Sequence, residues 1–173
     1  MQTTLSRVDV EGIVEAATLA PSVLNIQPWR FVWADDVIEV HRDLSRTLPA
    51  LDPQNRAVTI SCGAALLNLR LAVAHAGRRP IVDVDPLWSH PTLLARVRMD
   101  IAGVPTGTES RLFEAIPHRQ SCRVPFTDEP IAPECVMRME GAARSEGAEL
   151  LVLRTSRAEQ AACPARPGVR LLG

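Results

Sequence analysis

The feature that most constrains this chain is a long apolar segment near its middle. The sequence predicts one helix from Asp52 to Ala76, with Gly77 as the cap that ends it. Apolar side chains lie almost all round this helix: Val58, Ile60, Leu66, Leu67, Leu69, Leu71 and Val73. A helix of this kind must be buried on most of its faces. Its uncharged part, residues 57–69, is shorter than the ~20 residues that span a bilayer, so we expect a central core helix and no membrane partner.

Shorter elements are expected on both sides of this central helix. Hydrophobic spacing and capping signals predict helices over Val8–Leu19, Thr108–Ile116 and Pro133–Glu146. Alternation and turn residues predict strands over Trp29–Ala34, Val37–Arg42, Ala95–Ile101 and Glu149–Leu153. Asp35 and Asp36 suggest a hairpin turn between the first two strands. The third strand alternates apolar residues with charged ones, which predicts one solvent-facing side.

Composition argues against several classes of function. A formal net charge of −1 gives no electrostatic case for a nucleic-acid partner. The four cysteines show no CxxC spacing and the four histidines no HxxxH spacing, so no metal site is expected. Scattered thiols and a polar N-terminus without an apolar signal region are typical of a cytoplasmic protein with reduced cysteines.

Two prolines enclose a run of hydrogen-bonding side chains just after the first expected helix. The stretch from residue 20 to residue 31 reads APSVLNIQPWRF and places Ser22, Asn25 and Gln27 after Pro21. Uncharged donors and acceptors in this order suit the wall of a pocket for a flat polar heterocycle. For Asn25 the alternative is a local Asx turn that stabilises the loop. For Gln27 the binding and the structural interpretations are equally open.

A second stretch, from residue 118 to residue 126, reads HRQSCRVPF. Arg119, Ser121 and Arg123 alternate in it, so in an extended segment their side chains point to one side. Two guanidiniums and a hydroxyl suit a phosphate, through charge-assisted and often bidentate hydrogen bonds. Taken alone, the pattern is also common on solvated surfaces. The combination with the first stretch is what favours a binding site.

Together the two stretches resemble a known family. The patterns A-P-S-x-x-N-x-Q-P-W-x-F and R-x-S-x-R-x-x-F resemble the nitroreductase family of flavoproteins, and CGAALLNLRLAVAHAG, from Cys62 to Gly77, resembles the central helix of that family. The resemblance implies an α+β fold, with a mixed sheet and flanking helices around a long central helix. It also implies an FMN cofactor bound between two subunits.

The order of the motifs is reversed relative to a classical nitroreductase, in which R-x-S-x-R comes first. This order resembles the Acg-type nitroreductase-like proteins, which join two such halves in one chain. The resemblance implies that residues 1–105 are the first half, residues 106–153 the start of a second half, and residues 154–173 an irregular tail. We therefore expect a second half that is incomplete.

The resemblance also implies which residues contact the cofactor. They are Pro21, Ser22, Asn25, Gln27, Arg119, Ser121 and Arg123. The Arg motif would hold the FMN phosphate, and the first loop would contact the flavin or its ribityl chain. No catalytic side chain is implied, because a bound flavin supplies the chemistry itself.

The expected function is that of an FMN-dependent oxidoreductase of nitroreductase type. It would pass hydride from NAD(P)H through the flavin to a small-molecule acceptor, such as a nitroaromatic or a quinone. A homodimer is the assembly that the resemblance allows. Two alternatives stay open, namely a non-catalytic FMN-binding or storage protein and an inactive truncated fragment.

Overall fold

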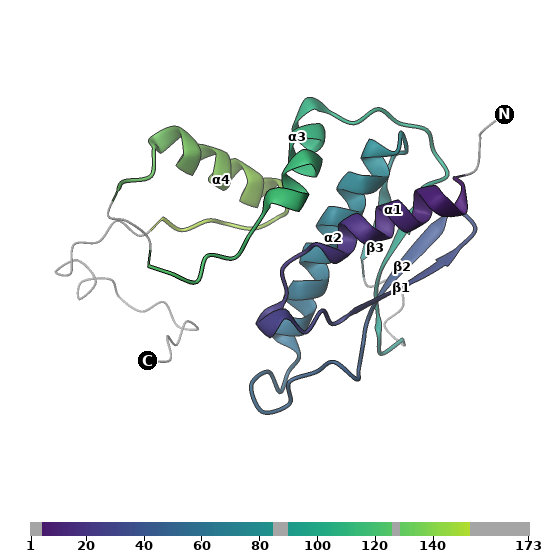
Figure 1. Cartoon of the computed structure of the whole chain (residues 1–173), viewed down its shortest axis with the longest axis horizontal. Coiled ribbons are helices and arrows are strands. Elements are labelled where there is room, and N and C mark those ends of the chain that lie inside the picture. Colours follow the sequence, from purple (N-terminus) through teal and green to yellow (C-terminus); the bar gives the residue numbers. More distant parts are fainter. Residues whose placement is uncertain (1–4, 85–89, 126–128, 153–173) are drawn as a thin grey trace. The chain divides into compact units, whose positions relative to one another are not determined.

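The computed structural model describes residues 5–84, 90–125 and 129–152 (Figure 1). The chain divides into two units, Met1–Arg123 and Val124–Gly173. The boundary predicted at residue 105 separates two homologous halves, whereas the boundary after Arg123 separates two compact units. The predicted boundary between the halves therefore stays a prediction. The predicted tail, residues 154–173, lies outside the described residues.

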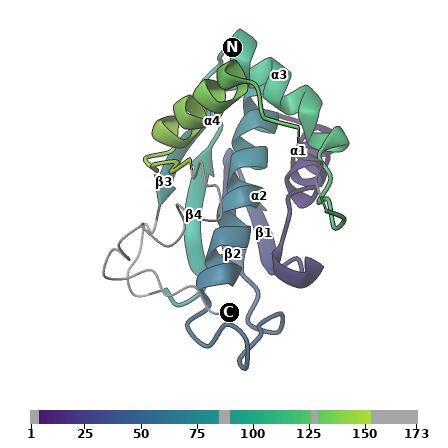
Figure 2. The same ribbon diagram turned by 90° about the vertical axis from the view of Figure 1, so that its left-hand side faces the viewer.

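The first unit packs helices against one face of a four-stranded sheet. Its elements in chain order are α1 (Arg7–Thr18), the 3-10 turn η1 (Val23–Asn25), β1 (Trp29–Ala34), β2 (Val37–Arg42), α2 (Arg56–His75), β3 (Ile81–Val84), β4 (Leu93–Arg98), α3 (Gly107–Ala115) and the 3-10 turn η2 (Ile116–His118). Figure 2 shows α2 lying over the sheet, where it contacts β2 and β4. The structure therefore confirms the α+β class.

The sheet has the strand order β1-β2-β4-β3, and every described strand pair is antiparallel. The resemblance implied a mixed sheet, which contains at least one pair of parallel strands. No parallel pair is present among the described strands. Parallel neighbours need a long crossover connection. Here β1 and β2 are joined by the predicted two-residue turn, since Ala34 pairs with Val37.

The predicted alternation of the third strand is confirmed for residues 95–98 in β4, which begins at Leu93 and ends before the predicted residues Met99 to Ile101. Ala95 and Val97 are fully buried, whereas Arg96 and Arg98 belong to the opposite face of the pleat. The strand β3 was not predicted. It is only four residues long and is defined by its pairing with β4, which local sequence does not reveal.

The central helix begins later than predicted, at Arg56 instead of Asp52. The reason is that Asp52 acts as a cap from outside the helix, because its Oδ2 accepts a hydrogen bond from the Val58 N–H at 3.0 Å. Asn55 stands between them in the left-handed region, with φ of 54°. A side chain that pairs the unsatisfied first N–H groups of a helix must lie before the helix starts.

The core of the first unit lies between α1, α2 and the sheet. Its buried residues are Val10, Ile13, Ala17, Ile38, Val40, Leu69, Ala72, Val73, Ala95, Val97 and Met99. By length and composition α2 could span a membrane, but 50% of its most apolar window is buried inside the protein, as in a core helix. The predicted burial of α2 is confirmed for its C-terminal half, whereas Ile60 near its start is 63% exposed.

The second unit contains α4 (Pro133–Ser145). The prediction for this helix is confirmed, because Pro133 stands in its first turn and Gly147 follows it with φ of 72°. The strand predicted over Glu149–Leu153 is wrong for residues 149–152, which form no strand, and Leu153 lies outside the described residues. A strand exists only through pairing, and the described residues offer this segment no partner strand.

On the sheet face opposite the core, Glu39 links β2 to β4. Its carboxylate accepts a hydrogen bond from Arg96 Nε at 2.8 Å and lies 3.0 Å from His41 Nε2. These hydrogen bonds, of which the one to His41 has the larger effect, hold the pKa of Glu39 below its ordinary value of 4.5. The charged form of Glu39 is thus part of the native state.

We expect Glu39 to contribute to the acid sensitivity of the first unit. A carboxyl whose pKa is lowered by folding stabilises the protein above its unfolded pKa, ordinarily 4.5, and loses this effect as the pH falls through the lower folded pKa. The free energy of unfolding of Glu39→Gln should therefore change less between about pH 6 and about pH 3 than that of the parent. Urea titrations across this range measure the slope. Glu11→Gln, in an exposed ion pair on α1, is the control, and equal slopes for both variants would contradict the assignment.

Candidate functional site

The first predicted motif forms a tight loop, residues 21–28, which we call the Pro21–Pro28 loop. Ser22 closes it, because its Oγ accepts a hydrogen bond from the Gln27 N–H at 2.9 Å. Three residues of the loop adopt left-handed backbone conformations: Leu24 with φ of 47°, Asn25 with 58° and Gln27 with 49°. Such conformations cost non-glycine residues roughly 1–2 kcal/mol each, although Asn tolerates them better. Strain of this kind clusters at ligand-binding and catalytic sites.

Long-range hydrogen bonds hold the Pro21–Pro28 loop in place. The Val23 N–H donates to Ser61 Oγ on α2 at 3.1 Å. At the other end, Arg46 Nη1 donates to the Gln27 carbonyl at 3.1 Å. Sequence reasoning missed both anchors. The one local signal for Ser61 is a hydroxyl residue in a mostly apolar helix, and Thr59 gives the same signal.

The loop presents its predicted binding residues to solvent to different degrees. Pro21 and Asn25 are exposed, and Ser22 and Gln27 are half-buried. An Asx turn would need a bond from the Asn25 side chain to nearby backbone, and no such bond is present among the described residues. The contacts of these four residues with a cofactor stay predictions.

Beneath the loop lies a buried apolar cluster that fixes its last residues. Trp29 is 7% exposed and packs with Ala20, Cys62 and Ala65. The thiol of Cys62 donates to the Pro28 carbonyl at 3.6 Å. Burial raises the pKa of Cys62 to about 11, so at neutral pH this residue is a protonated thiol rather than a nucleophile.

A pocket of about 260 Å³ lies between the loop and the start of α2. Its lining residues are Pro21, Ser22, Val23, Ala57, Ile60, Ser61 and Ala64. The pocket is largely apolar, with the serine hydroxyls as its polar side chains. Apolar walls with a few placed polar groups are typical of small-molecule sites.

The second predicted motif lies at the end of the first unit, directly after η2. Arg119, Ser121 and Arg123 are all exposed. Arg119 Nη1 lies 3.5 Å from Ser121 Oγ, as expected for side chains on one side of the segment. Arg123 is not joined to the other two by a hydrogen bond in the described part of the chain. The phosphate role of all three residues stays a prediction.

One hydrogen bond joins the second motif to the end of α1, just before the first motif, within a single chain. Arg119 Nη2 donates to the Leu19 carbonyl at 3.3 Å. Leu19 is the C-terminal cap of α1 and stands two residues before Pro21, the first residue of the loop. The structure thus brings Arg119 of the second motif to the helix end that precedes the first motif, across 100 residues of sequence.

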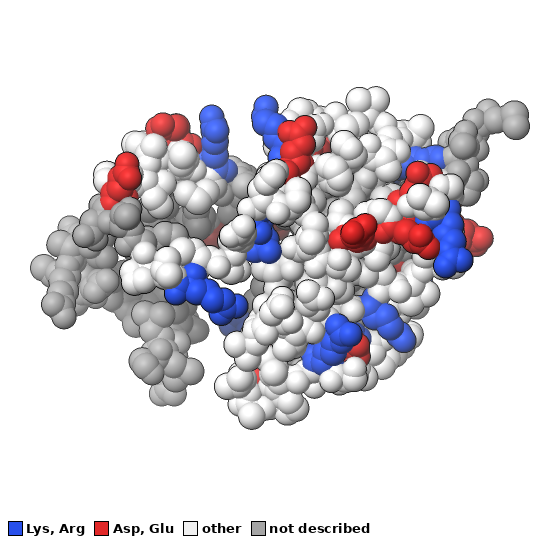
Figure 3. All heavy atoms as spheres, in the orientation of Figure 1, with Lys and Arg blue, Asp and Glu red and all other residues white. Residues whose placement is uncertain are grey.

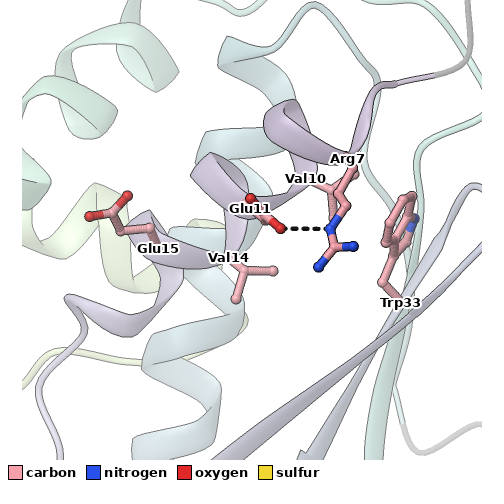
Figure 4. Close-up of a pocket in the computed structure, with 6 residues that line it drawn as sticks. All are labelled: Arg7, Val10, Glu11, Val14, Glu15 and Trp33. Atoms are coloured by element: carbon pink, nitrogen blue, oxygen red, sulfur yellow. Dashed lines mark hydrogen bonds and ion pairs between the residues drawn. The ribbon is translucent and has the colours of Figure 1, made fainter.

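A larger open pocket of about 600 Å³ lies elsewhere, between α1 and β1 (Figure 4). None of the predicted binding residues lines it. In Figure 4 the guanidinium of Arg7 lies between Glu11 and Trp33, and Arg7 Nε is 2.8 Å from Glu11 Oε1. This ion pair is exposed, and with Glu15 it gives the lining of the pocket a net negative charge, which does not suit a phosphate.

Charge and metal-ligating groups add little to the site. Arg and acidic side chains are interspersed over the face shown in Figure 3. The described residues contain no group of three or more His, Cys, Asp or Glu side chains that could hold a metal ion.

Comparison with known proteins supports the relationship suggested by the motifs. Residues 2–56 match the model described as "Nitroreductase family". The protein named "Putative NAD(P)H nitroreductase acg" of Mycobacterium tuberculosis is 34% identical over 121 residues, which are 70% of this chain and 37% of that protein. "Uncharacterized protein Rv3127" of the same organism is 33% identical over 126 residues, with 70% of this chain and 36% of that protein covered. The chain thus spans about a third of the length of these curated relatives.

Among solved structures, a similar chain is "a putative nitroreductase in complex with fmn" from Desulfovibrio desulfuricans. It has a TM-score of 0.48 and 20% identity, and the match covers 76% of this chain and 90% of that one. The family match lies over the first motif, and the homology to the mycobacterial protein extends over most of the described residues. Residues 2–56 thus match the nitroreductase family, and over 121 residues the chain is homologous to the Acg protein of Mycobacterium tuberculosis.

Proposed function

We propose that the chain binds FMN and serves as an NAD(P)H-dependent oxidoreductase of nitroreductase type. The observation that carries this proposal is the hydrogen bond from Arg119 to the Leu19 carbonyl. It sets the segment suited to a phosphate beside the loop suited to a heterocycle, within one chain. The name of the Acg relative supports NAD(P)H as the electron donor.

The residues present fit the chemistry of this cofactor. A guanidinium has five N–H donors, and the bonds of Arg119 to Leu19 and Ser121 use only part of them. Arg119 and Arg123 would pair with the phosphate, and Ser121 would add a hydroxyl. Ser22 and Asn25 would offer hydrogen bonds to the flavin or its ribityl chain. When bound, FMN would supply the two-electron chemistry between NAD(P)H and a small-molecule acceptor.

The pocket beside the loop is smaller than the roughly 300–1,000 Å³ of typical ligand sites. We therefore propose that it holds only a part of the cofactor. A second surface would cover the remainder, and a second copy of the chain is the assembly that we favour. The exposed Ile60, which lines this pocket, would be covered in such a homodimer.

The test of this proposal is the visible absorption of the protein. We expect the full chain, incubated with FMN and desalted, to keep the flavin bands, and mass spectrometry of the released ligand to identify FMN. Loss of reduced nicotinamide absorbance on adding an aromatic nitro compound or a quinone would establish turnover. A folded but colourless protein would contradict FMN binding. A yellow protein that does not oxidise NADH or NADPH would indicate the non-catalytic alternative.

A further inference from the structure

We propose that Ser61 is a positioning residue, which holds the Pro21–Pro28 loop in the conformation that binds the flavin. The proposal rests on the proposed function, because the loop is the predicted contact for the cofactor. Ser61 is on α2 and is 5% exposed. Its neighbours on the pocket wall are Ala57, Ile60 and Ala64, so its hydroxyl is the polar group that this stretch of helix offers to the loop.

The two hydrogen bonds of Ser61 fix the orientation of its hydroxyl group. Its Oγ lies 2.7 Å from the Ala57 carbonyl and 3.1 Å from the backbone N of Val23. A hydroxyl has one proton, and a carbonyl can only accept. The proton of Ser61 therefore goes to Ala57, and a lone pair of Oγ receives the Val23 N–H. The helix orients the serine, and the serine in turn fixes one point of the loop.

The point that Ser61 fixes is where the strained backbone begins. Val23 is the first residue of η1, and the left-handed residues Leu24 and Asn25 follow it directly. A strained backbone persists only where its surroundings determine it. With the Val23 N–H released, Leu24 would relax toward an ordinary conformation and Asn25 would move with it. The loss of a fixed conformation would affect the binding loop and not the main core, because the main core does not include Ser61.

The helix offers a matched control in Thr59. The Thr59 hydroxyl donates to the Asn55 carbonyl at 2.8 Å, which repeats the bond of Ser61 to the carbonyl four residues earlier. Thr59 is exposed and makes no hydrogen bond to the loop among the described contacts. Thr59→Ala thus removes the same helical bond without touching the anchor. Ser61→Thr keeps the hydroxyl, and the adjoining pocket offers space for its methyl group.

The first measurement is the FMN affinity of the full-length chain, followed by quenching of flavin fluorescence. We expect Ser61→Ala to bind FMN about tenfold more weakly, and Thr59→Ala and Ser61→Thr to remain within about threefold of the parent. The circular dichroism of the bound flavin should change in Ser61→Ala and be restored in Ser61→Thr. Equal losses in Ser61→Ala and Thr59→Ala, or no rescue by Ser61→Thr, would overturn the proposal.

The second measurement needs no flavin and separates this inference from the proposed function. Hydrogen exchange of peptides covering residues 21–28 should be faster in Ser61→Ala than in the parent and unchanged in Thr59→Ala. Unchanged exchange in Ser61→Ala would refute the anchor even if FMN binds. If the parent binds no FMN, the proposed function fails, and faster exchange in Ser61→Ala would still support Ser61 as the anchor of the loop.

Discussion

Replacing Arg119 or Arg123 with Ala should weaken FMN binding by roughly tenfold to a hundredfold. Each variant would lose a charge-assisted hydrogen bond to the phosphate, which contributes about 1.5–3 kcal/mol, and about 1.4 kcal/mol corresponds to a factor of ten in affinity. Flavin fluorescence titrations of the full chain measure the dissociation constant. Because phosphate is charged, the affinity of the parent should also fall as salt is added, and that of the variants should fall less.

Arg98→Ala is the matched control for this pair. Arg98 is an exposed arginine of the same unit, at the end of β4 on the sheet face opposite the core, so its removal changes the net charge equally. We expect its FMN affinity to stay within about twofold of the parent, since an exposed surface charge outside the two motifs is largely screened. Equal weakening in Arg98→Ala would mean that overall charge, not a phosphate contact, sets the affinity.

Leu69→Ala should lower the free energy of unfolding of the first unit by about 2–5 kcal/mol. Leu69 is fully buried in the core, where residues of α1, β2 and β4 meet α2. Truncating it removes apolar burial and leaves a cavity that these elements cannot readily fill. Urea unfolding followed by tryptophan fluorescence measures the loss, because Trp29 is buried in this unit.

Ile60→Ala is the comparison on the same helix. Ile60 is 63% exposed, so its truncation should cost less than about 1 kcal/mol. A similar loss for the two variants would mean that both halves of α2 are covered in solution. That result would favour the homodimer, and it would make the unfolding midpoint of the parent depend on protein concentration.

The secondary structure was predictable where capping and turn residues mark the ends of an element, but the strand predicted over Glu149–Leu153 from its residues alone was wrong for residues 149–152. The predicted helix Val8–Leu19 agrees with α1 to within one residue at each end, and the predicted turn at Asp35 and Asp36 joins β1 to β2. The strand β3 was missed because its identity comes from its partner. The start of α2 was misplaced because the capping carboxylate of Asp52 reaches a backbone N–H six residues away.

The candidate site was predictable only as two motifs. The residue types in each segment suggested what it could bind, and the resemblance to the nitroreductases suggested that they act together. The contacts that place them join residues far apart in sequence: Val23 and Ser61 are separated by 38 positions, and Leu19 and Arg119 by 100. No periodicity or spacing rule encodes such pairs, so a structure was needed to find them.

The segment that carries Arg119 and Arg123 also offers a protease an accessible place to cut this protein. Trypsin cleaves after basic residues, and all 19 of them in this chain are Arg. The segment is exposed, forms neither helix nor strand, and ends at the boundary between the two units. Exposed connections of this kind are preferred sites of cleavage. Cleavage after Arg123 would leave the sheet, the core and the Pro21–Pro28 loop in one fragment. A phosphate held by the two arginines would shield the same peptide bonds, so the rate of digestion would report whether the site is occupied.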